Sequence, residues 1–211
     1  MRRPIVSLLD PIVRRRIDGV AARLVEEYAG VFSRETVEQV VADSLDRLGP
    51  VSVMAHLPVL TERFARQRLR AVAHIEGLVA KPRPAVLFIC VQNAARSQMA
   101  AALARHISEG RIDVMSAGSD PVSAINASVV DALDELGLET ALEFPKPLTD
   151  EVVRAADVVV TMGCGDACPI FPGPRYLDWD VADPADQDLE AVRAIRQDIA
   201  NHILDLLKEL L

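Results

Sequence analysis

The sequence has no long apolar run, few cysteines and a shortage of positive charge, and each of these absences excludes a class of protein. No uninterrupted apolar stretch approaches the ~20 residues that a membrane-spanning helix needs. The formal net charge of −8 argues against a nucleic-acid partner, because nucleic-acid binders gain affinity from many lysine and arginine contacts to phosphates. There are only three cysteines, and an odd number in a chain expected to be cytoplasmic favours reactive thiols over a disulfide framework.

The N-terminal segment, "MRRPIVSLLDPIVRRR", has two arginines before a short apolar patch. The patch is broken by Asp10 and Pro11 and has no small-residue cleavage site, so we expect mature protein rather than a signal peptide. The rest of the composition is globular, with half of the residues hydrophobic and no repeat or low-complexity tract. We therefore expect a soluble cytoplasmic protein, with core material for one domain and a smaller companion.

The first 80 residues carry a helical pattern throughout. Asp10 and Pro11 have the character of a cap and a first helical position. Apolar side chains then recur at intervals of three and four, at Val13, Ile17, Val20, Leu24 and Tyr28. Two further amphipathic stretches follow, over 33–48 and 58–75. Three amphipathic helices with short connections predict a small bundle, which we assign as a three-helix N-terminal domain over residues 1–80.

The pattern changes after the proline-rich joint "KPRP" at residues 81–84. The run "AVLFI" is continuously apolar, as expected of a strand buried on both faces. Further strands are predicted in "IDVMSAG", "DVVVTM" and "RYLDWDV", and helices over 97–109, 125–136, a short stretch from Asp150 with Thr149 as its cap, and 189–211. Strands that alternate with helices predict an α/β domain over residues 85–211, with a parallel sheet flanked by helices.

The first candidate site lies where the first strand of this domain ends, at Cys90. Ligands of open parallel sheets bind beyond the carboxyl ends of the strands. In the loop that follows Cys90, successive main-chain N–H groups can point into one concavity, and the start of the next helix adds partial positive charge. Such a loop binds a tetrahedral oxyanion. Its predicted binding residues are Val91, Gln92, Asn93, Ala94, Ala95, Arg96 and Ser97.

Three side chains of this loop have distinct expected tasks. Arg96 can hold two oxygens of the anion in a planar fork, and Ser97 can donate a hydrogen bond to the sulfur of Cys90. Asn93 can hold the loop by hydrogen bonds, and asparagine tolerates a left-handed turn. The field at a helix N-terminus is expected to favour the thiolate of Cys90, making it a nucleophile. The alternative interpretation is a small buried cysteine beside a surface arginine.

The segment "VLFICVQNAARSQMA" resembles the active-site segment of the low-molecular-weight protein tyrosine phosphatases and of the arsenate reductases built on the same fold. The shared signature is a cysteine, five residues, then arginine and serine; "SAGSDP" and "DVVVTM" match as well. The resemblance implies a flavodoxin-like four-stranded parallel sheet, a covalent cysteinyl intermediate and no organic cofactor. The helices of residues 1–80 are additional and resemble small N-terminal domains of some actinobacterial-type arsenate reductases. Their expected roles are stabilisation or partner contact, including self-association.

Two further cysteines favour the reductase branch of this family, because reduction takes two electrons from thiols. Cys164 and Cys168 lie in the loop "TMGCGDACPIFPG", after the third strand. The resemblance implies that Cys90 attacks arsenate and that Cys164 then attacks Cys90, releasing arsenite. Cys168 next displaces Cys90, and thioredoxin or a low-molecular-weight thiol opens the resulting bond. The alternatives are a zinc site, which lacks a nearby histidine, and two incidental thiols.

The general acid is predicted to be Asp183, because the Asp-Pro pair matches the acid loop of the family; Asp178 and Asp180 are alternatives on chemistry alone. Ala185 follows where the tyrosine phosphatases commonly carry an aromatic residue, which disfavours phosphotyrosine. Some such reductases bind potassium through an acidic residue where Ala101 stands, so we expect no metal. The leading hypothesis is a thiol-dependent arsenate reductase. The alternatives are a low-molecular-weight phosphatase and an oxyanion-binding sensor module.

Overall fold

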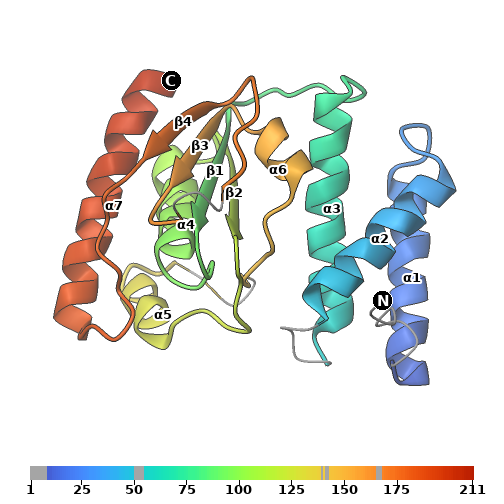
Figure 1. The fold of residues 1–211 in the computed structure, drawn as a ribbon, viewed down its shortest axis with the longest axis horizontal. Coiled ribbons are helices and arrows are strands. Elements are labelled where there is room, and N and C mark those ends of the chain that lie inside the picture. The colour runs from blue at the N-terminus through green and yellow to red at the C-terminus, as the bar shows by residue number, and fades with distance from the viewer. Residues whose placement is uncertain (1–8, 50–54, 139, 141–142, 165–167) are drawn as a thin grey trace. The chain divides into compact units, whose positions relative to one another are not determined.

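The computed structural model describes residues 9–49, 55–138, 140, 143–164 and 168–211 (Figure 1). The chain divides into two compact units, Met1–Ala80 and Lys81–Leu211, which we call the N-terminal and C-terminal units. Each unit has a buried apolar core of its own. Among the described residues, no helix has the length and apolar character needed to cross a membrane.

The N-terminal unit contains the three helices that the periodicity predicts: α1 (Pro11–Glu27), α2 (Arg34–Leu48) and α3 (Leu57–Ile75). Asp10 caps α1, since its Oδ1 accepts a hydrogen bond from the N–H of Ile12 at 2.7 Å. Ser33 caps α2 in the same way, accepting from the N–H of Thr36 at 3.1 Å. The expected helical bundle is confirmed, with the fully buried side chains Leu24, Val37, Leu45, Leu48, Leu57, Phe64 and Leu69 in its core.

One buried charge joins two of these helices. Arg68 of α3 is only 7% exposed, and its guanidinium donates to Ser44 Oγ at 2.9 Å and to Asp43 Oδ2 at 2.7 Å, both on α2. A buried arginine is tolerated only when its donors are satisfied. Desolvation would raise the pKa of Asp43, but the hydrogen bond from Arg47 and the pairing with Arg68 together hold this pKa below its ordinary value.

The C-terminal unit is built on a four-stranded parallel sheet in the order β2-β1-β3-β4, which confirms the predicted flavodoxin-like fold. The sheet order reverses at β1, so the loops after β1 and β3 open at one edge, where α/β proteins bind their ligands. The strands are β1 (Ala85–Cys90), β2 (Asp113–Gly118), β3 (Val158–Thr161) and β4 (Arg175–Asp178). The helices are α4 (Arg96–Ser108), α5 (Ala127–Asp134), α6 (Asp150–Ala155) and α7 (Leu189–Leu210).

Helices cover both faces of this sheet (Figure 1). The alternate residues Val86, Phe88 and Cys90 of β1 share one core with α4, α5 and α7. The short helix α6 lies against β1 from the other face. Every residue of β1 is buried, as the unbroken apolar run predicts. The sulfur of Cys90 is therefore fixed on the α4 side of a rigid central strand.

Two helix predictions differ in detail from the structure. The helix predicted over 125–136 is shorter, because Asn126 caps it by accepting from the N–H of Ser128 at 2.9 Å. Thr149 does occupy the position before α6, but it makes no side-chain cap hydrogen bond, so that part of the prediction is wrong. The last strand ends at Asp178, and Trp179 turns into the core against Phe88.

Candidate active site

Cys90 is the last residue of β1 and is 3% exposed. It is the free cysteine of the described chain. Its Sγ lies 2.9 Å from the Oγ of Ser97, in the first turn of α4. Ser97 Oγ also accepts a hydrogen bond from Asn93 Nδ2 at 2.8 Å, so its own hydrogen is available to the sulfur. This direction stabilises a thiolate at Cys90.

Asn93 holds the turn of the loop from inside. It is completely buried and adopts the left-handed conformation, with φ of 49°, which confirms the expectation for this residue. Its Oδ1 accepts from the main-chain N–H of Lys146 at 2.8 Å and from Gln98 Nε2 at 3.0 Å. Asn93 therefore ties together the loop, the start of α4 and the segment before α6.

In the loop over residues 90–97, most main-chain carbonyl oxygens accept hydrogen bonds, whereas the main-chain N–H groups remain available. The carbonyl oxygens of Cys90, Val91, Gln92 and Ala94 accept from the main-chain N–H groups of Ser119, Asp120, Val122 and Asn126. By contrast, none of the N–H groups from Val91 to Ser97 donates to an oxygen of the described residues. Such a row of donors at the start of α4 is what an oxyanion requires.

Gly118, the last residue of β2, allows the loop after Cys90 to pack closely against this strand. A Cβ on Gly118 would lie 2.6 Å from the oxygen of Val91 and 2.8 Å from the nitrogen of Asn93. Both are main-chain atoms, so the loop would have to move to admit any side chain at this position. Gly118 pairs directly with Cys90 across the sheet. The sequence prediction used "SAGSDP" only as a family match and missed this packing role.

Arg96 begins α4 and is directed toward the segment after β4. Its Nη2 donates to Asp183 Oδ2 at 2.7 Å, and its Nη1 lies 3.5 Å from the carbonyl oxygen of Val181. The Arg96 side chain is 14% exposed and that of Asp183 is 51% exposed. Asp183 Oδ1 accepts from the N–H of Ala185 at 3.1 Å, which orients the carboxyl group. The structure thus brings the predicted anion clamp and the predicted acid into direct contact.

The other two acid candidates are not part of this arrangement. Asp178 ends β4, and its carboxylate accepts a 2.5 Å hydrogen bond from the hydroxyl of Thr161 on β3. Asp180 is exposed and follows the buried Trp179. Of the three aspartates, Asp183 is the one that forms an ion pair with Arg96.

The loop after β3 lies against the same arginine. Gly163 has φ of +73°, and a Cβ at this position would lie 2.7 Å from Nη1 of Arg96. Cys164 follows immediately and is 6% exposed. It forms a disulfide with Cys168, which is partly exposed, with Cα atoms 6.3 Å apart. The residues between these two cysteines lie outside the described part of the chain.

Sequence reasoning missed a buried amide beneath the loop. Gln98 is 2% exposed, and its Nε2 donates to Asn93 Oδ1 and to the carbonyl oxygen of Phe144 at 2.8 Å. The same carbonyl oxygen accepts from Nζ of the buried Lys146 at 3.1 Å. Gln98 is not among the site residues that the sequence predicted. Its position in the first turn of an otherwise apolar helix face was the available signal.

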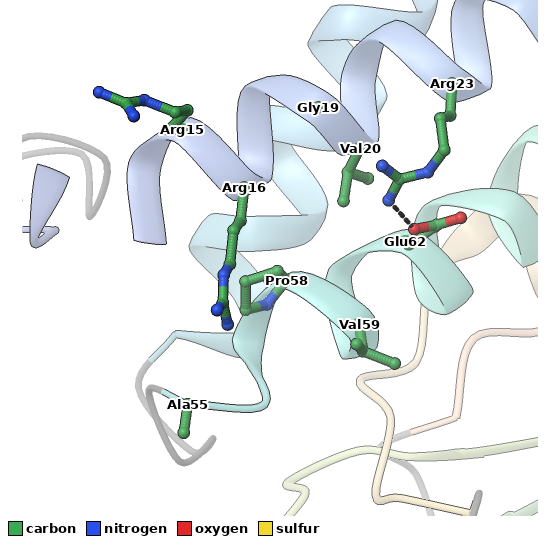
Figure 2. Close-up of a pocket in the computed structure, with 9 residues that line it drawn as sticks. All are labelled: Arg15, Arg16, Gly19, Val20, Arg23, Ala55, Pro58, Val59 and Glu62. Atoms are coloured by element: carbon green, nitrogen blue, oxygen red, sulfur yellow. Dashed lines mark hydrogen bonds and ion pairs between the residues drawn. The ribbon is translucent and has the colours of Figure 1, made fainter. Parts of the chain in front are cut away.

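A separate hollow of about 340 Å³ lies within the N-terminal unit (Figure 2). It is bordered by three arginines of α1 around the small apolar side chains of Val20, Pro58 and Val59. Figure 2 shows one of these arginines, Arg23, paired with Glu62 of α3. No cysteine lines this hollow, and none of the predicted site residues belongs to it.

The family comparison agrees with the two units. A family model described as low molecular weight phosphotyrosine protein phosphatase matches residues 85–211, and a protein-tyrosine-phosphatase-like N-terminal domain matches residues 17–73. The first match covers more than half of the chain. The chain therefore belongs to the low molecular weight phosphotyrosine protein phosphatase family.

Several relatives of this chain within the family are arsenate reductases. An arsenate reductase of Staphylococcus epidermidis is 30% identical over 118 residues, which span 54% of this chain and 88% of the relative. A glutaredoxin arsenate reductase of Synechocystis sp. is 28% identical over 132 residues, spanning 59% and 97%. The solved structure of a thioredoxin-dependent arsenate reductase of Corynebacterium glutamicum is 44% identical, with a TM-score of 0.84; the match covers 93% of this chain and 96% of that one.

Proposed function

We propose that this protein reduces arsenate to arsenite with electrons from thiols. Two features together support this proposal. The Cys90 thiol lies at the start of a loop whose main-chain N–H groups are available to an anion. A Cys164–Cys168 disulfide lies on the loop after β3, the strand next to β1. A phosphatase requires only the first of these two features. The arsenate reductases among the relatives support the same conclusion.

The first step is the formation of a covalent arsenate ester. Arsenate is held by the loop N–H groups and by the guanidinium of Arg96, and the Cys90 thiolate attacks the arsenic. One oxygen leaves as water after taking a proton from Asp183. Asp183 Oδ2 lies 2.7 Å from Arg96 Nη2, so its carboxyl group is next to the guanidinium that holds the anion.

The second step transfers two electrons to arsenic. The thiolate of Cys164 forms a bond to the sulfur of Cys90, the sulfur–arsenic bond breaks, and its electron pair stays on arsenic. Arsenic is reduced from the +5 to the +3 state, and arsenite leaves after taking up protons from water. The oxidised product of this step is a Cys90–Cys164 disulfide.

The third step frees the nucleophile. The thiolate of Cys168 attacks Cys164, and Cys90 departs as a thiolate. This step leaves a Cys164–Cys168 disulfide and a free Cys90, and a disulfide and a free thiol at these positions support the proposal. A reductant of the thioredoxin class then supplies two electrons to the disulfide, so that no organic cofactor is required.

A steady-state assay tests this function. Arsenite production is followed with thioredoxin, thioredoxin reductase and NADPH for the wild type and for Cys90→Ser, Cys164→Ser and Cys168→Ser. We expect no arsenite from Cys90→Ser or Cys164→Ser, and at most one equivalent from Cys168→Ser. Repeated turnover by Cys164→Ser or Cys168→Ser at the wild-type rate would contradict the proposed transfer of the disulfide from Cys90 through Cys164 to Cys168.

Phosphate-ester hydrolysis is the second candidate, because the family model that covers the C-terminal unit is that of a phosphatase. Hydrolysis would use Cys90, Arg96 and Asp183 but neither of the other cysteines. If the wild type and Cys164→Ser both hydrolyse p-nitrophenyl phosphate rapidly and the wild type makes no arsenite, the protein is a phosphatase and not a reductase. A sensor module would instead keep its function in Cys90→Ser.

A further inference from the structure

An isoleucine beside the disulfide is unusually exposed. Ile170 has 80% of its surface exposed, and no other large apolar side chain of the described residues is exposed to the same degree. Single exposed apolar residues are common on protein surfaces and need no explanation by themselves. The position of Ile170, two residues after Cys168, and the way in which its segment is held make this one different.

The segment that carries Ile170 is anchored to the sheet. The N–H of Phe171 donates to the Tyr176 hydroxyl at 2.8 Å, and the same hydroxyl approaches the oxygen of Phe171 at 3.4 Å. Tyr176 lies in β4. The guanidinium of Arg154 lies 6.0 Å from the centre of the Phe171 ring, within the range of a cation–π contact. Because the next residue is tied down in this way, the outward position of Ile170 is built into the structure.

Reduction of the Cys164–Cys168 disulfide requires a thiol to approach the surface near Ile170. A thiol that opens the bond has to bring its sulfur into bonding distance of Cys168 or Cys164. Cys164 is 6% exposed and Cys168 is partly exposed, so Cys168 is the accessible end. Two residues of chain span at most about 7 Å. A protein that reaches Cys168 therefore comes within about 7 Å of the main chain at Ile170.

We propose that Ile170 is the apolar anchor on which a dithiol protein of the thioredoxin class docks to reduce this enzyme. This inference rests on the proposed function, since it assumes that the Cys164–Cys168 bond is opened in each catalytic cycle. The partner must present an apolar surface around its own reactive cysteine. Because the main chain at Phe171 is already anchored, docking at Ile170 costs less conformational entropy than docking on a loop that must first be ordered.

The partner reduces the Cys164–Cys168 disulfide by two successive thiol–disulfide exchange steps. A thiolate of the partner forms a bond to Cys168 Sγ, the Cys164–Cys168 bond breaks, and Cys164 leaves as a thiolate that takes a proton from water. The second thiolate of the partner then attacks its own mixed-disulfide sulfur. Cys168 is released as a thiolate, the partner becomes a disulfide, and two electrons have passed to this chain.

The test compares a protein reductant with a small one, in the absence of arsenate. The full-length protein is oxidised to the Cys164–Cys168 disulfide, and its opening is timed with reduced thioredoxin and separately with dithiothreitol. The variants are Ile170→Ala, Ile170→Leu as a conservative replacement, and Leu204→Ala as a matched control on α7, where Leu204 is 45% exposed. All of these side chains are exposed, so the substitutions leave the core intact.

We expect Ile170→Ala to slow opening by thioredoxin about tenfold, as for an interface anchor, and to leave opening by dithiothreitol unchanged. Ile170→Leu and Leu204→Ala should behave like the wild type with both reductants. Equal rates for Ile170→Ala and wild type with thioredoxin would overturn the proposal, as would a wild-type disulfide that thioredoxin does not open. If thioredoxin opens the disulfide here but the wild type makes no arsenite in the steady-state assay, the proposed function is refuted and the docking result stands.

Discussion

Replacing Asn93 by alanine tests whether the loop is held in its binding shape from inside. The substitution removes the acceptor of two hydrogen bonds, from the main-chain N–H of Lys146 and from Gln98 Nε2, and the donor to Ser97. All three partners belong to buried residues. Asn93 has φ of 49°, which alanine adopts only with strain. The variant therefore loses both polar contacts and backbone compatibility.

The magnitude follows from these contacts. Each buried donor left without an acceptor costs about 1–3 kcal/mol, and a left-handed alanine costs about 1–2 kcal/mol. The sum for Asn93→Ala is roughly 3–8 kcal/mol in the free energy of unfolding. Whole domains are stable by about 5–15 kcal/mol, so the loss is a large share of the total. Asn93→Gly keeps the loss of polar contacts but removes the strain, and it should lie between alanine and the wild type.

The assay is urea unfolding followed by tryptophan fluorescence. Trp179 is the single tryptophan of the chain, and it is buried in the core of the C-terminal unit, so the signal reports that unit. We expect the free energy of unfolding to fall in the order wild type, Asn93→Gly, Asn93→Ala. An Asn93→Ala protein within about 1 kcal/mol of the wild type would show that Asn93 does not hold the loop, because a single buried donor without an acceptor already costs that much.

Three further predictions concern the anion clamp, the nucleophile and acid stability. Gly163→Ala should lower kcat/KM for arsenate at least about tenfold, because the added Cβ meets Arg96 Nη1 at 2.7 Å; unchanged kinetics would contradict that contact. Ser97→Ala should slow alkylation of Cys90 by iodoacetamide at neutral pH, measured by mass spectrometry on the oxidised protein, and an equal rate would remove the hydroxyl from the account. Hydrogen bonds from Arg193 and then Arg196 hold the pKa of Glu135 at about 2, so its contribution to stability is complete above the unfolded pKa of about 4.3 and is lost as the pH falls toward 2. Glu135→Gln should therefore lose less stability than the wild type over that pH interval, and equal losses in urea unfolding would contradict the linkage.

The elements of the fold follow from local patterns, and for that reason they could be predicted. The alternation of apolar runs and amphipathic stretches marks every strand and helix of the C-terminal unit, and capping residues such as Asp10 and Ser33 mark helix starts. The left-handed conformation of Asn93 also follows from local chemistry. Helix boundaries are predicted less accurately: the helix predicted from Ile125 begins at Ala127, because Asn126 caps it.

The contacts of the site that span long distances in sequence could not be read from these patterns. Arg96 and Asp183 are 87 residues apart, and the sequence predicted their separate tasks but not their ion pair. The bond from Gln98 to the oxygen of Phe144 spans 46 residues. Periodicity carries no information about such pairs, since it reports only which face of an element is buried. The order of the strands, which sets these distances, was likewise not available from the pattern.

The whole catalytic cycle depends on the transfer of oxidation from Cys90 to Cys164, and a single turnover of the Cys168→Ser variant measures this transfer. The fully reduced variant is mixed with arsenate, quenched with acid, digested and analysed by mass spectrometry without reduction. We expect one arsenite per protein chain and a peptide pair linked by a Cys90–Cys164 disulfide. Release of arsenite with Cys90 and Cys164 both recovered as free thiols would contradict this transfer.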